Sequence, residues 1–430
     1  MKVAIIGGAG VRTPLLVDGL TRSDLPIDEI ALFDIDRDRL ATIAGVAGAY
    51  SNAVRAYDEA PACISGASFV FLSIRVGGID ARARDERIAV AHGVVGQETV
   101  GPAGFAMAMR TIPHAVGYAR LVETEAPGAW LINFTNPVSV ITQAIAVETK
   151  AKTIGICDTP TELFEDAAHV LGFEASRCYF DYFGLNHLGW LREVYCDGVP
   201  QLARVWDEPD AVTRIYRTPL FDVGFLRTLR LLPTEYLYFY YSPEKALEHL
   251  RAAGQTRGGT IAALNEELFR DLAAGSDRRA IYERYLAARS ASYMQLESGS
   301  AARRSLGEGG PSALTGYDKI ALNVVCAIHF NANAIIPLDV RNGGAIRDLD
   351  DADIVEVPCV VNAAGARPLA VGAIPETVED LIMRVKDYEW LTAHAATTRA
   401  DDDAVRALAR NPLVDDMALA ERLVAALKPW

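Results

Sequence analysis

The sequence has 430 residues, which is long enough for two domains with separate hydrophobic cores. Half of the residues are hydrophobic, as in a packed globular protein, and the formal net charge is -14. This acidic balance argues against nucleic acid or an anionic membrane surface as a partner, although a local basic pocket for a small anion stays possible. No apolar run approaches the roughly 20 residues that span a bilayer, and Met1 and Lys2 lead directly into a predicted strand, so we expect neither a membrane span nor a signal peptide.

The six cysteines lie far apart, at positions 63, 157, 178, 196, 326 and 359. They lack the clustering of cysteines in secreted, disulfide-rich proteins. We therefore expect reduced thiols and a cytoplasmic protein.

The first apolar segment, residues 3–6, is typical of a buried strand and leads through a glycine-bearing turn into a helix-like stretch. Backbone N–H groups of such a turn approach a pyrophosphate, and we interpret Gly8, Gly10 and Val11 as the residues that do so. Thr13 stands where the dinucleotide-binding fingerprint has its third glycine, so this motif alone is a weak signal.

The second apolar segment, residues 30–33, ends at Asp34, which lies 26 residues beyond Gly8. A carboxylate at this place binds the ribose hydroxyls of NAD and repels the 2′-phosphate of NADP. We therefore predict NAD as the cofactor, with a helix cap or a solvated turn as the alternative for Asp34.

Three more apolar segments, separated by helical stretches, predict a doubly wound parallel sheet of the Rossmann kind. We place this dinucleotide-binding domain at residues 1–160 and a second, mostly helical α+β domain at residues 161–430. Because the carboxyl ends of parallel strands meet at one edge of the sheet, the polar residues at these ends are expected to converge. The segments are 68–74, 129–134 and 153–156, and the polar residues are Arg75, Asn133, Asn136, Cys157 and Asp158.

The second domain begins with alternating apolar and polar residues at 177–196, a pattern typical of strands. Long helical stretches follow at 261–274, 278–296, 374–396 and 402–428. Residues 298–316 are rich in glycine and are expected to form a flexible loop.

A thiol and an imidazole, Cys157 and His187, follow apolar segments and are 30 residues apart. A structural zinc site needs four ligands, usually with two in a tight C-x-x-C or H-x-x-x-H pair, and neither spacing occurs in this chain. The pair alone is weak evidence of a metal site, with a buried thiol and a hydrogen-bonded core histidine as the alternative.

Three other segments carry groups suited to binding or catalysis. Residues 92–101, which include Glu98, combine glycines with polar groups and predict a loop over the cofactor or substrate, with an ordinary surface loop as the alternative. Residues 236–241 hold four tyrosines, which mostly serve packing, although a phenol acts as a base where a cation lowers its pKa. Arg257 lies in a glycine-bearing segment suited to an anion.

Together these motifs resemble glycoside hydrolase family 4. The resemblance covers the chain from residue 3 to about residue 260, in the family's order, and residues 354–358 resemble a further family segment. The matching motifs are Gly8-Ala-Gly10 with Thr13-Pro14, Arg75-Val-Gly-Gly, residues 92–101, Asn133-Phe-Thr-Asn136-Pro137, Gly155-Ile-Cys157-Asp158-Thr-Pro160, Gly184-Leu-Asn186-His187, and Tyr236-Leu-Tyr238 followed by Thr256-Arg257.

The resemblance implies a fold related to lactate and malate dehydrogenases and the cleavage of glycosides, commonly 6-phosphoglycosides, with NAD and a divalent metal, usually Mn²⁺. The implied reaction begins with oxidation of the sugar at carbon 3 and continues with removal of the carbon 2 proton and elimination of the aglycone. It ends with addition of water and return of the hydride, so no net oxidation occurs. Ordinary glycosidases use two flanking carboxylates instead.

Residue roles follow from the same resemblance. Cys157 and His187 match the metal ligands, Asp158 the proposed acid and Tyr236 the proposed base. The nucleotide site would include Arg75 and Asn133 beside the glycine turn and Asp34. The remaining matches place the phosphorylated sugar at Arg82, Glu98, Asn136, Asn186 and Arg257. Self-association as a homodimer or homotetramer is also expected.

Several alternatives stay open. The Cys-Asp-x-Pro motif resembles the α-glycoside group, whereas Gly-Leu-Asn-His-Leu-Gly-Trp resembles 6-phospho-β-glucosidases, which gives a lean toward the β anomer. Tyr238, Tyr240 and Tyr241 compete with Tyr236 as the base. A plain NAD-dependent dehydrogenase of a 2-hydroxy acid would use the same nucleotide domain without needing Cys157, and an NAD sensor would leave Cys157 and His187 without a role.

Overall fold

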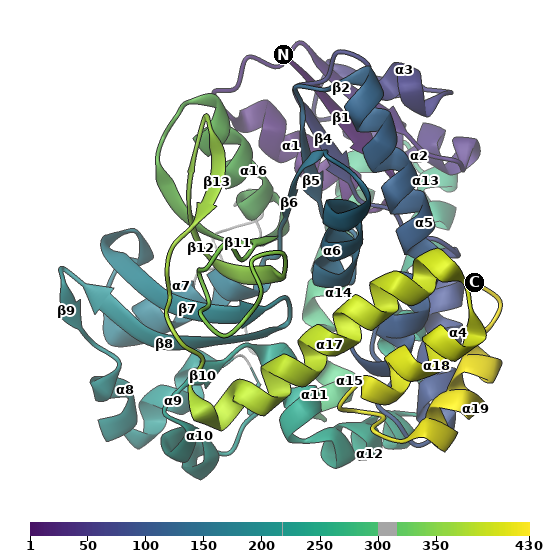
Figure 1. Ribbon diagram of the computed structural model, residues 1–430. Coiled ribbons are helices and arrows are strands. Elements are labelled where there is room, and N and C mark those ends of the chain that lie inside the picture. The colour runs from purple at the N-terminus through teal and green to yellow at the C-terminus, as the bar shows by residue number, and fades with distance from the viewer. Residues whose placement is uncertain (217, 300–315) are drawn as a thin grey trace.

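The computed structural model describes residues 1–216, 218–299 and 316–430. A nine-stranded sheet runs through the upper part of the molecule (Figure 1). Its strands lie in the order β13-β12-β11-β6-β5-β4-β1-β2-β3. They are β1 (Lys2–Ile6), β2 (Glu29–Phe33), β3 (Val54–Tyr57), β4 (Phe69–Leu72), β5 (Trp130–Asn133), β6 (Lys152–Gly155), β11 (Ala334–Arg341), β12 (Ile354–Asn362) and β13 (Gly365–Pro368).

The six N-terminal strands of this sheet are parallel and confirm the predicted doubly wound fold. Their apolar runs, such as Val3–Ile6 and Phe69–Leu72, are buried because helices cover both faces of a parallel sheet. The helices of this half are α1 (Thr13–Arg22), α2 (Arg37–Ala47), α3 (Ala60–Ile64), α4 (Gly78–Ala91), α5 (Gly101–Glu125), α6 (Val138–Glu148) and α7 (Thr159–Leu171).

The sheet continues beyond residue 160 through three antiparallel strands from late in the chain. β11 joins β6 through the pairing of Asp339 with Gly155, and β12 and β13 extend the sheet outward. The predicted boundary near residue 160 therefore does not divide the large sheet, and the division into two domains stays a prediction.

A smaller antiparallel sheet carries the predicted strands of residues 177–196. Its strands are β7 (Cys178–Leu185), β8 (Leu188–Cys196), β9 (Val199–Pro200) and β10 (Leu232–Pro233). Around it and toward the C-terminus lie the helices α8 (Ala203–Asp207), α9 (Pro209–Ile215), α10 (Val223–Leu229), α11 (Tyr238–Tyr241), α12 (Pro243–Ala253), α13 (Arg257–Ala274), α14 (Arg278–Ala291), α15 (Gln295–Ser298), α16 (Gly316–His329), α17 (Glu376–Thr398), α18 (Asp401–Arg410) and α19 (Met417–Leu427), with 3-10 turns η1 (Ala175–Arg177) and η2 (Glu235–Leu237).

The predicted helices exist, with two differences. The stretch 402–428 is broken into α18 and α19, because Asn411 precedes Pro412 and takes an extended conformation, as residues before proline prefer. The stretch 278–296 ends early at Ala291, and Met294 has a left-handed φ of 54°. The predicted loop 298–316 lies almost wholly outside the described residues.

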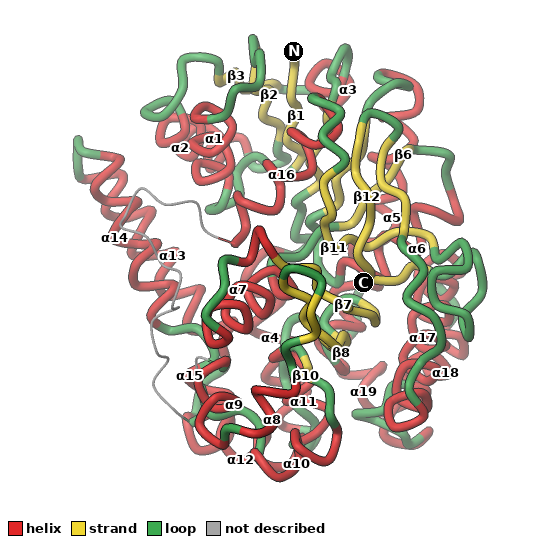
Figure 2. The backbone as a smooth tube through the Cα atoms, turned by 90° about the vertical axis from the view of Figure 1, so that its left-hand side faces the viewer, coloured by secondary structure: helices red, strands yellow, loops and turns green. Residues whose placement is uncertain are grey.

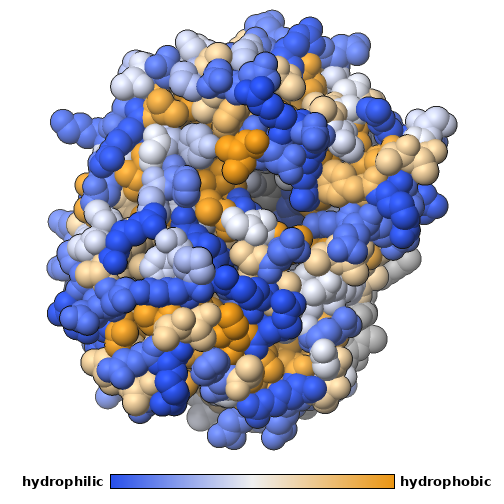
Figure 3. All heavy atoms as spheres, turned by 90° about the vertical axis from the view of Figure 1, so that its right-hand side faces the viewer, coloured by the Kyte–Doolittle hydropathy of each residue, from blue (hydrophilic) through white to orange (hydrophobic). Residues whose placement is uncertain are grey.

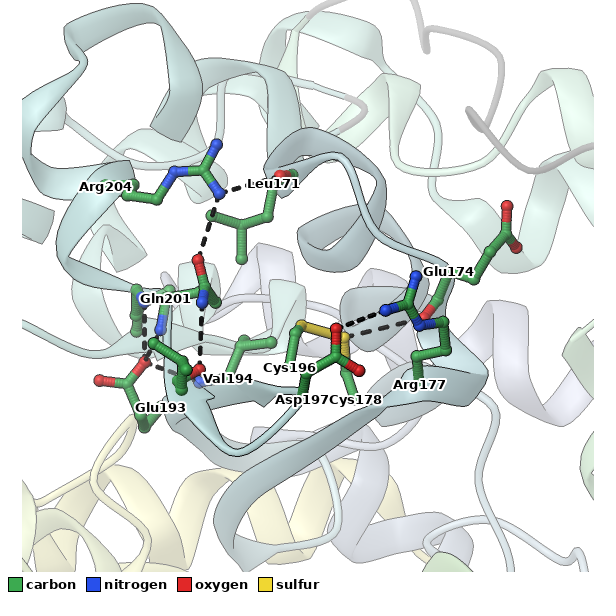
Figure 4. The surroundings of a disulfide bond; sticks show 12 residues. Leu171, Glu174, Arg177, Cys178, Glu193, Val194, Cys196, Asp197, Gln201 and Arg204 are labelled. Atoms are coloured by element: carbon green, nitrogen blue, oxygen red, sulfur yellow. Dashed lines mark hydrogen bonds and ion pairs between the residues drawn. A yellow bond between two sulfur atoms is a disulfide. The ribbon is translucent and has the colours of Figure 1, made fainter.

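Cys178 and Cys196 face each other in the antiparallel pairing of β7 with β8 and form a disulfide (Figure 4). This finding corrects the prediction that all six cysteines are reduced. The sequence conceals the pairing, because the hairpin register brings together residues 18 positions apart. Cys63, Cys157, Cys326 and Cys359 are free. The cysteines therefore no longer support a cytoplasmic location, which stays a prediction.

Figure 3 shows the face of the molecule that lies on the right-hand side of Figure 1. This face is mainly polar, with separate apolar areas between the polar ones. Within the described ranges, none of the helices combines the length and the apolar character that crossing a membrane requires.

Candidate active site

A cavity of about 750 Å³ opens at the carboxyl ends of the parallel strands. Gly7, Asp34, Ser73, Phe134 and Ile156, which come immediately after β1, β2, β4, β5 and β6, all line it. The convergence expected from the sequence therefore occurs. Of the residues predicted for the site, the cavity is lined by Gly10, Val11, Asp34, Arg75, Arg82, Glu98, Asn136, Cys157, Asp158, His187, Tyr236 and Arg257.

The turn after β1 is built on Gly7, which was not among the predicted site residues. Gly7 has a φ of 92°, and a Cβ there would lie 2.1 Å from the Ser73 carbonyl oxygen, so only glycine fits. The N–H of Gly10 donates to the Gly7 carbonyl at 3.0 Å, and α1 begins at Thr13. Gly8 is not among the cavity-lining residues, and a Cβ there would lie 3.0 Å from the Leu32 side chain.

Asp34 joins the end of β2 to this turn. Its two carboxylate oxygens accept hydrogen bonds from the N–H groups of Ala9 and Asp36, each at 3.1 Å. Beside it, Ile35 is 85% exposed and lines the cavity. An apolar side chain next to a fixed carboxylate suits the adenine ring of a dinucleotide and its ribose.

Glu98 is held between two arginines inside the cavity. It forms ion pairs with Arg75 and with Arg82, the latter at 2.7 Å, and Arg82 also binds the buried Glu86 at 2.8 Å. Burial raises the pKa of Glu98, but the charges of Arg75 and Arg82 lower it by more, so the pKa lies well below its usual value. Glu98 is therefore ionised at neutral pH and cannot serve as a general acid.

Cys157 lies two residues beyond the end of β6, and His187 lies in the tight turn between β7 and β8, with a left-handed φ of 61°. Burial lowers the pKa of His187 to about 4, with Glu98 opposing, so the imidazole is neutral. Its Nδ1 lies 2.9 Å from the Thr99 hydroxyl. Burial, with Glu356 and Asp158, raises the pKa of the Cys157 thiol well above its usual value.

Tyr236 stacks flat on the His187 ring, with 3.8 Å between the ring centroids. Its hydroxyl lies 3.5 Å from that of Tyr293, which donates a 2.5 Å hydrogen bond to Glu235. Burial raises the pKa of Tyr236. The hydrogen bond with Tyr293 lowers this pKa, and the negative charges of Glu235 and Glu98 raise it further. The phenol is therefore neutral in this state of the site.

Arg257 opens α13 and is tied to the end of α14. It donates to the carbonyls of Ser292 and Arg289 at 2.8 and 3.0 Å. Asp158 lies 4.0 Å from Arg12. Arg257 and Asp158 both line the cavity, although they come from distant segments of the chain.

Two predicted residues stand behind the cavity and are not among its lining. The Asn133 amide donates to the Thr142 hydroxyl at 2.9 Å, and its carbonyl oxygen accepts from the N–H of Thr135. The Asn186 amide donates to Glu356 at 3.2 Å. Both residues shape the turns that carry cavity residues, and a direct role in binding stays a prediction for each.

Other cavity-lining residues were missed, namely Arg12, Glu162, Asn265, Arg289, Ser290 and Tyr293. Those on α13 and α14 carry no motif, and only the tertiary packing of these helices brings them to the site.

Comparison with known proteins identifies the family. Residues 2–173 match the model of family 4 glycosyl hydrolases, and residues 182–414 match the model of that family's C-terminal domain. The chain is 31% identical to a probable 6-phospho-beta-glucosidase of Bacillus subtilis, over 99% of this chain and 95% of that one.

Solved structures with a similar fold cover 99% of this chain. The 6-phospho-beta-glucosidase of Thermotoga maritima with manganese, NAD⁺ and glucose-6-phosphate superposes with a TM-score of 0.83 at 26% identity, covering 99% of this chain and 97% of that one. A 6-phospho-alpha-glucosidase from gut microorganisms with NAD and Mn²⁺ gives 0.80 at 25% identity, with the same coverage. A metagenomic lactate dehydrogenase, 14% identical with a TM-score of 0.56, shares the fold alone. The chain therefore belongs to family 4 of the glycosyl hydrolases.

Proposed function

We propose that this protein hydrolyses 6-phosphoglucosides with NAD and a divalent metal, Mn²⁺ among them. The observation that carries the proposal is the meeting, in one cavity, of a dinucleotide-type glycine turn, the Cys157 and His187 pair, and several arginines. Family relatives with NAD, manganese and glucose-6-phosphate support it.

The nucleotide end of the cavity fits NAD. The Gly7 turn approaches the sheet closely enough that no side chain could replace the glycine, and the N-terminus of α1 follows directly. Asp34 supplies a carboxylate whose position is fixed by two backbone N–H groups. These features suit a pyrophosphate and an unphosphorylated ribose.

The donors suited to a metal are Cys157 and His187. The imidazole is neutral, as a metal ligand must be, and Nδ1 is engaged by Thr99, which leaves Nε2 as the ligand atom. Among the described residues no three acidic, histidine or cysteine side chains are grouped to hold an ion. The site thus suits a catalytic metal completed by substrate and water, not a closed structural one.

When bound, the oxidised nicotinamide supplies a reversible hydride acceptor and the metal a Lewis acid. The chain's own residues do the rest. Tyr236 would take the carbon 2 proton through its phenol oxygen, Asp158 would protonate the departing glycosidic oxygen, and Arg82, Asn136 and Arg257 would orient the phosphorylated sugar. Because the pKa of Tyr236 is raised, its role as base requires a positive charge close to it in the loaded site.

An ordinary carboxylate-pair mechanism with Asp158 and Glu98 is the alternative within hydrolases. Glu98 is already bound by Arg75 and Arg82, which hold it in place and weaken it as a base or nucleophile. The geometry therefore favours the route through Tyr236.

The deciding experiment is turnover of chromogenic 6-phosphoglucosides of both anomers in deuterium oxide. We expect activity that requires NAD and Mn²⁺ and product glucose 6-phosphate that carries deuterium at carbon 2. The unphosphorylated glucosides serve as controls. Turnover without NAD, or product free of deuterium, would contradict the proposal, and net NADH formation from a 2-hydroxy acid would instead indicate a dehydrogenase.

We further propose the β anomer as the preferred substrate and a homodimer or homotetramer as the assembly. The proposed preference for the β anomer rests on the Gly-Leu-Asn-His-Leu-Gly-Trp stretch of residues 184–190, which resembles 6-phospho-β-glucosidases. The proposed self-association rests on the resemblance to the family and on the tyrosine-rich, apolar helical half of the chain.

A further inference from the structure

The cavity wall formed by α13 and α14 carries an arginine to which no role has been assigned above. Arg289 lies in the last turn of α14 and lines the cavity together with Arg257 and Asn265 of α13. The two helices lie side by side as a hairpin (Figure 2). This wall therefore presents two guanidinium groups to the same cavity.

The two arginines are coupled through the backbone. The Arg289 carbonyl accepts a 3.0 Å hydrogen bond from Nη2 of Arg257, while Nη1 of Arg257 donates to the Ser292 carbonyl at 2.8 Å. The position of Arg257 is thus set by the main chain at the end of α14. Replacing the side chain of Arg289 leaves these acceptors in place.

Arg289 is held by a neutral group. Its Nη1 donates to the Tyr285 hydroxyl at 2.8 Å, and that hydroxyl donates to the Asn265 side chain at 2.8 Å. Burial lowers the pKa of Arg289 to about 10; Tyr285 opposes this, and the charges of Arg12 and Arg82 lower it further. It remains a cation at neutral pH, and an anion placed beside it would be stabilised.

The direction of α14 indicates which part of the cavity Arg289 serves. Near the middle of α14, the Tyr282 hydroxyl donates to the Val11 carbonyl of the glycine turn at 2.8 Å. Arg289 lies seven residues further along, which is about 10 Å on an α-helix. The charges of Arg12, at the start of α1, and of Arg82 both act on Arg289, and Arg289 in turn acts on Glu98. Arg289 therefore lies between the glycine turn and the ion pair of Arg82 with Glu98.

We propose that Arg289 is a second phosphate-binding arginine, which with Arg257 holds the phosphate group of the sugar substrate and so sets the preference for phosphorylated over unphosphorylated glycosides. The proposal rests on the proposed function for the identity of the sugar. Two guanidinium groups suit a phosphate dianion, because each carries a permanent positive charge and several N–H donors.

The test is binding of glucose 6-phosphate and of glucose to the NAD-loaded protein by calorimetry, beside the KM of the 6-phosphoglucoside. Arg289→Gln should weaken glucose 6-phosphate binding and raise KM by roughly 10- to 100-fold, while glucose binding and the NAD Kd change less than about twofold. Arg289→Lys, which keeps the cation and a donor to Tyr285, should recover most of the affinity. The matched control is Arg284→Gln on the same helix, because the Arg284 side chain is 72% exposed and lies 3.9 Å from Asp271.

Two results would overturn the proposal. A raised NAD Kd with unchanged glucose 6-phosphate binding would assign Arg289 to the pyrophosphate of the cofactor. Equal weakening for glucose and glucose 6-phosphate would show that Arg289 only supports the packing of α14. If the unmutated protein binds glucose 6-phosphate but turns over no glycoside, the proposed function fails while the arginine site stands.

Discussion

The choice between NAD and NADP should depend on the charge of Asp34. Asp34→Ala removes one hydrogen bond to the glycine turn, from Ala9, one from Asp36 and the proposed contact with the ribose, so we expect NAD binding to weaken by about 1 to 3 kcal/mol. Asp34→Asn removes the charge but keeps one of the two acceptor oxygens, so it disturbs the turn less than Asp34→Ala does.

The ratio of the two dissociation constants, Kd(NADP)/Kd(NAD), gives the cleanest measure, because damage to the turn weakens both dinucleotides alike. Two unit charges 4 Å apart interact by about 1 kcal/mol in water, and a 2′-phosphate carries nearly two charges. Removing the Asp34 charge should therefore lower the ratio by about 2 kcal/mol, or roughly 30-fold.

Both constants can be measured by fluorescence titration, with Asp38→Asn as the control, since Asp38 is exposed and is not among the cavity-lining residues. The reasoning is refuted if the unmutated protein binds NADP more tightly than NAD, or if Asp34→Asn leaves the ratio unchanged.

Four other predictions concern the substrate end of the cavity. Arg257→Ala should raise KM for phosphorylated substrates by orders of magnitude and hardly change the NAD Kd; equal activity on unphosphorylated glycosides would rule out a phosphate site. Cys157→Ser should lower Mn²⁺ affinity and activity together while NAD binding survives, as calorimetry can show. Tyr236→Phe keeps the ring that stacks on His187, so metal and NAD binding should persist while deuterium exchange at carbon 2 is lost. The pKa of His187 is about 4 in the folded protein, whereas an exposed histidine has a pKa of about 6.5. Between these pH values the unfolded chain binds a proton that the folded chain does not, so the unfolding free energy should fall by on the order of 2 kcal/mol as the pH drops from 6.5 toward 4. Urea titrations should show a weaker pH dependence in His187→Gln.

The parallel sheet and several cavity residues follow from local sequence patterns. Apolar segments of four to seven residues precede Asp34, Arg75 and Cys157 and place those groups at one edge of the sheet, whatever the later chain does. The prediction that Cys157 and His187 share a metal required further evidence, because their spacing alone does not indicate a common site. Family motifs supplied that link, and the cavity brings both residues to its wall.

The parts that the sequence could not predict depend on contacts between distant segments. The need for glycine at position 7 arises from the Ser73 carbonyl of a neighbouring strand, and Arg289 reaches the cavity only because α14 packs beside the glycine turn. The Cys178 to Cys196 disulfide likewise depends on the hairpin register. None of these contacts has a periodicity or a motif that could reveal it.

The antiparallel extension of the sheet has a consequence for the site. Glu356 of β12 accepts hydrogen bonds from Tyr182 at 2.5 Å and from Asn186 at 3.2 Å, and these residues belong to the hairpin whose turn carries His187. Glu356 is fully buried, so breaking these bonds would leave an unsatisfied carboxyl group, which is costly. The β6 strand that delivers Cys157 pairs with β11, the neighbour of β12. The late strands β11 and β12 thus fix the positions of the two proposed metal ligands relative to each other, although the ligands follow strands of different sheets.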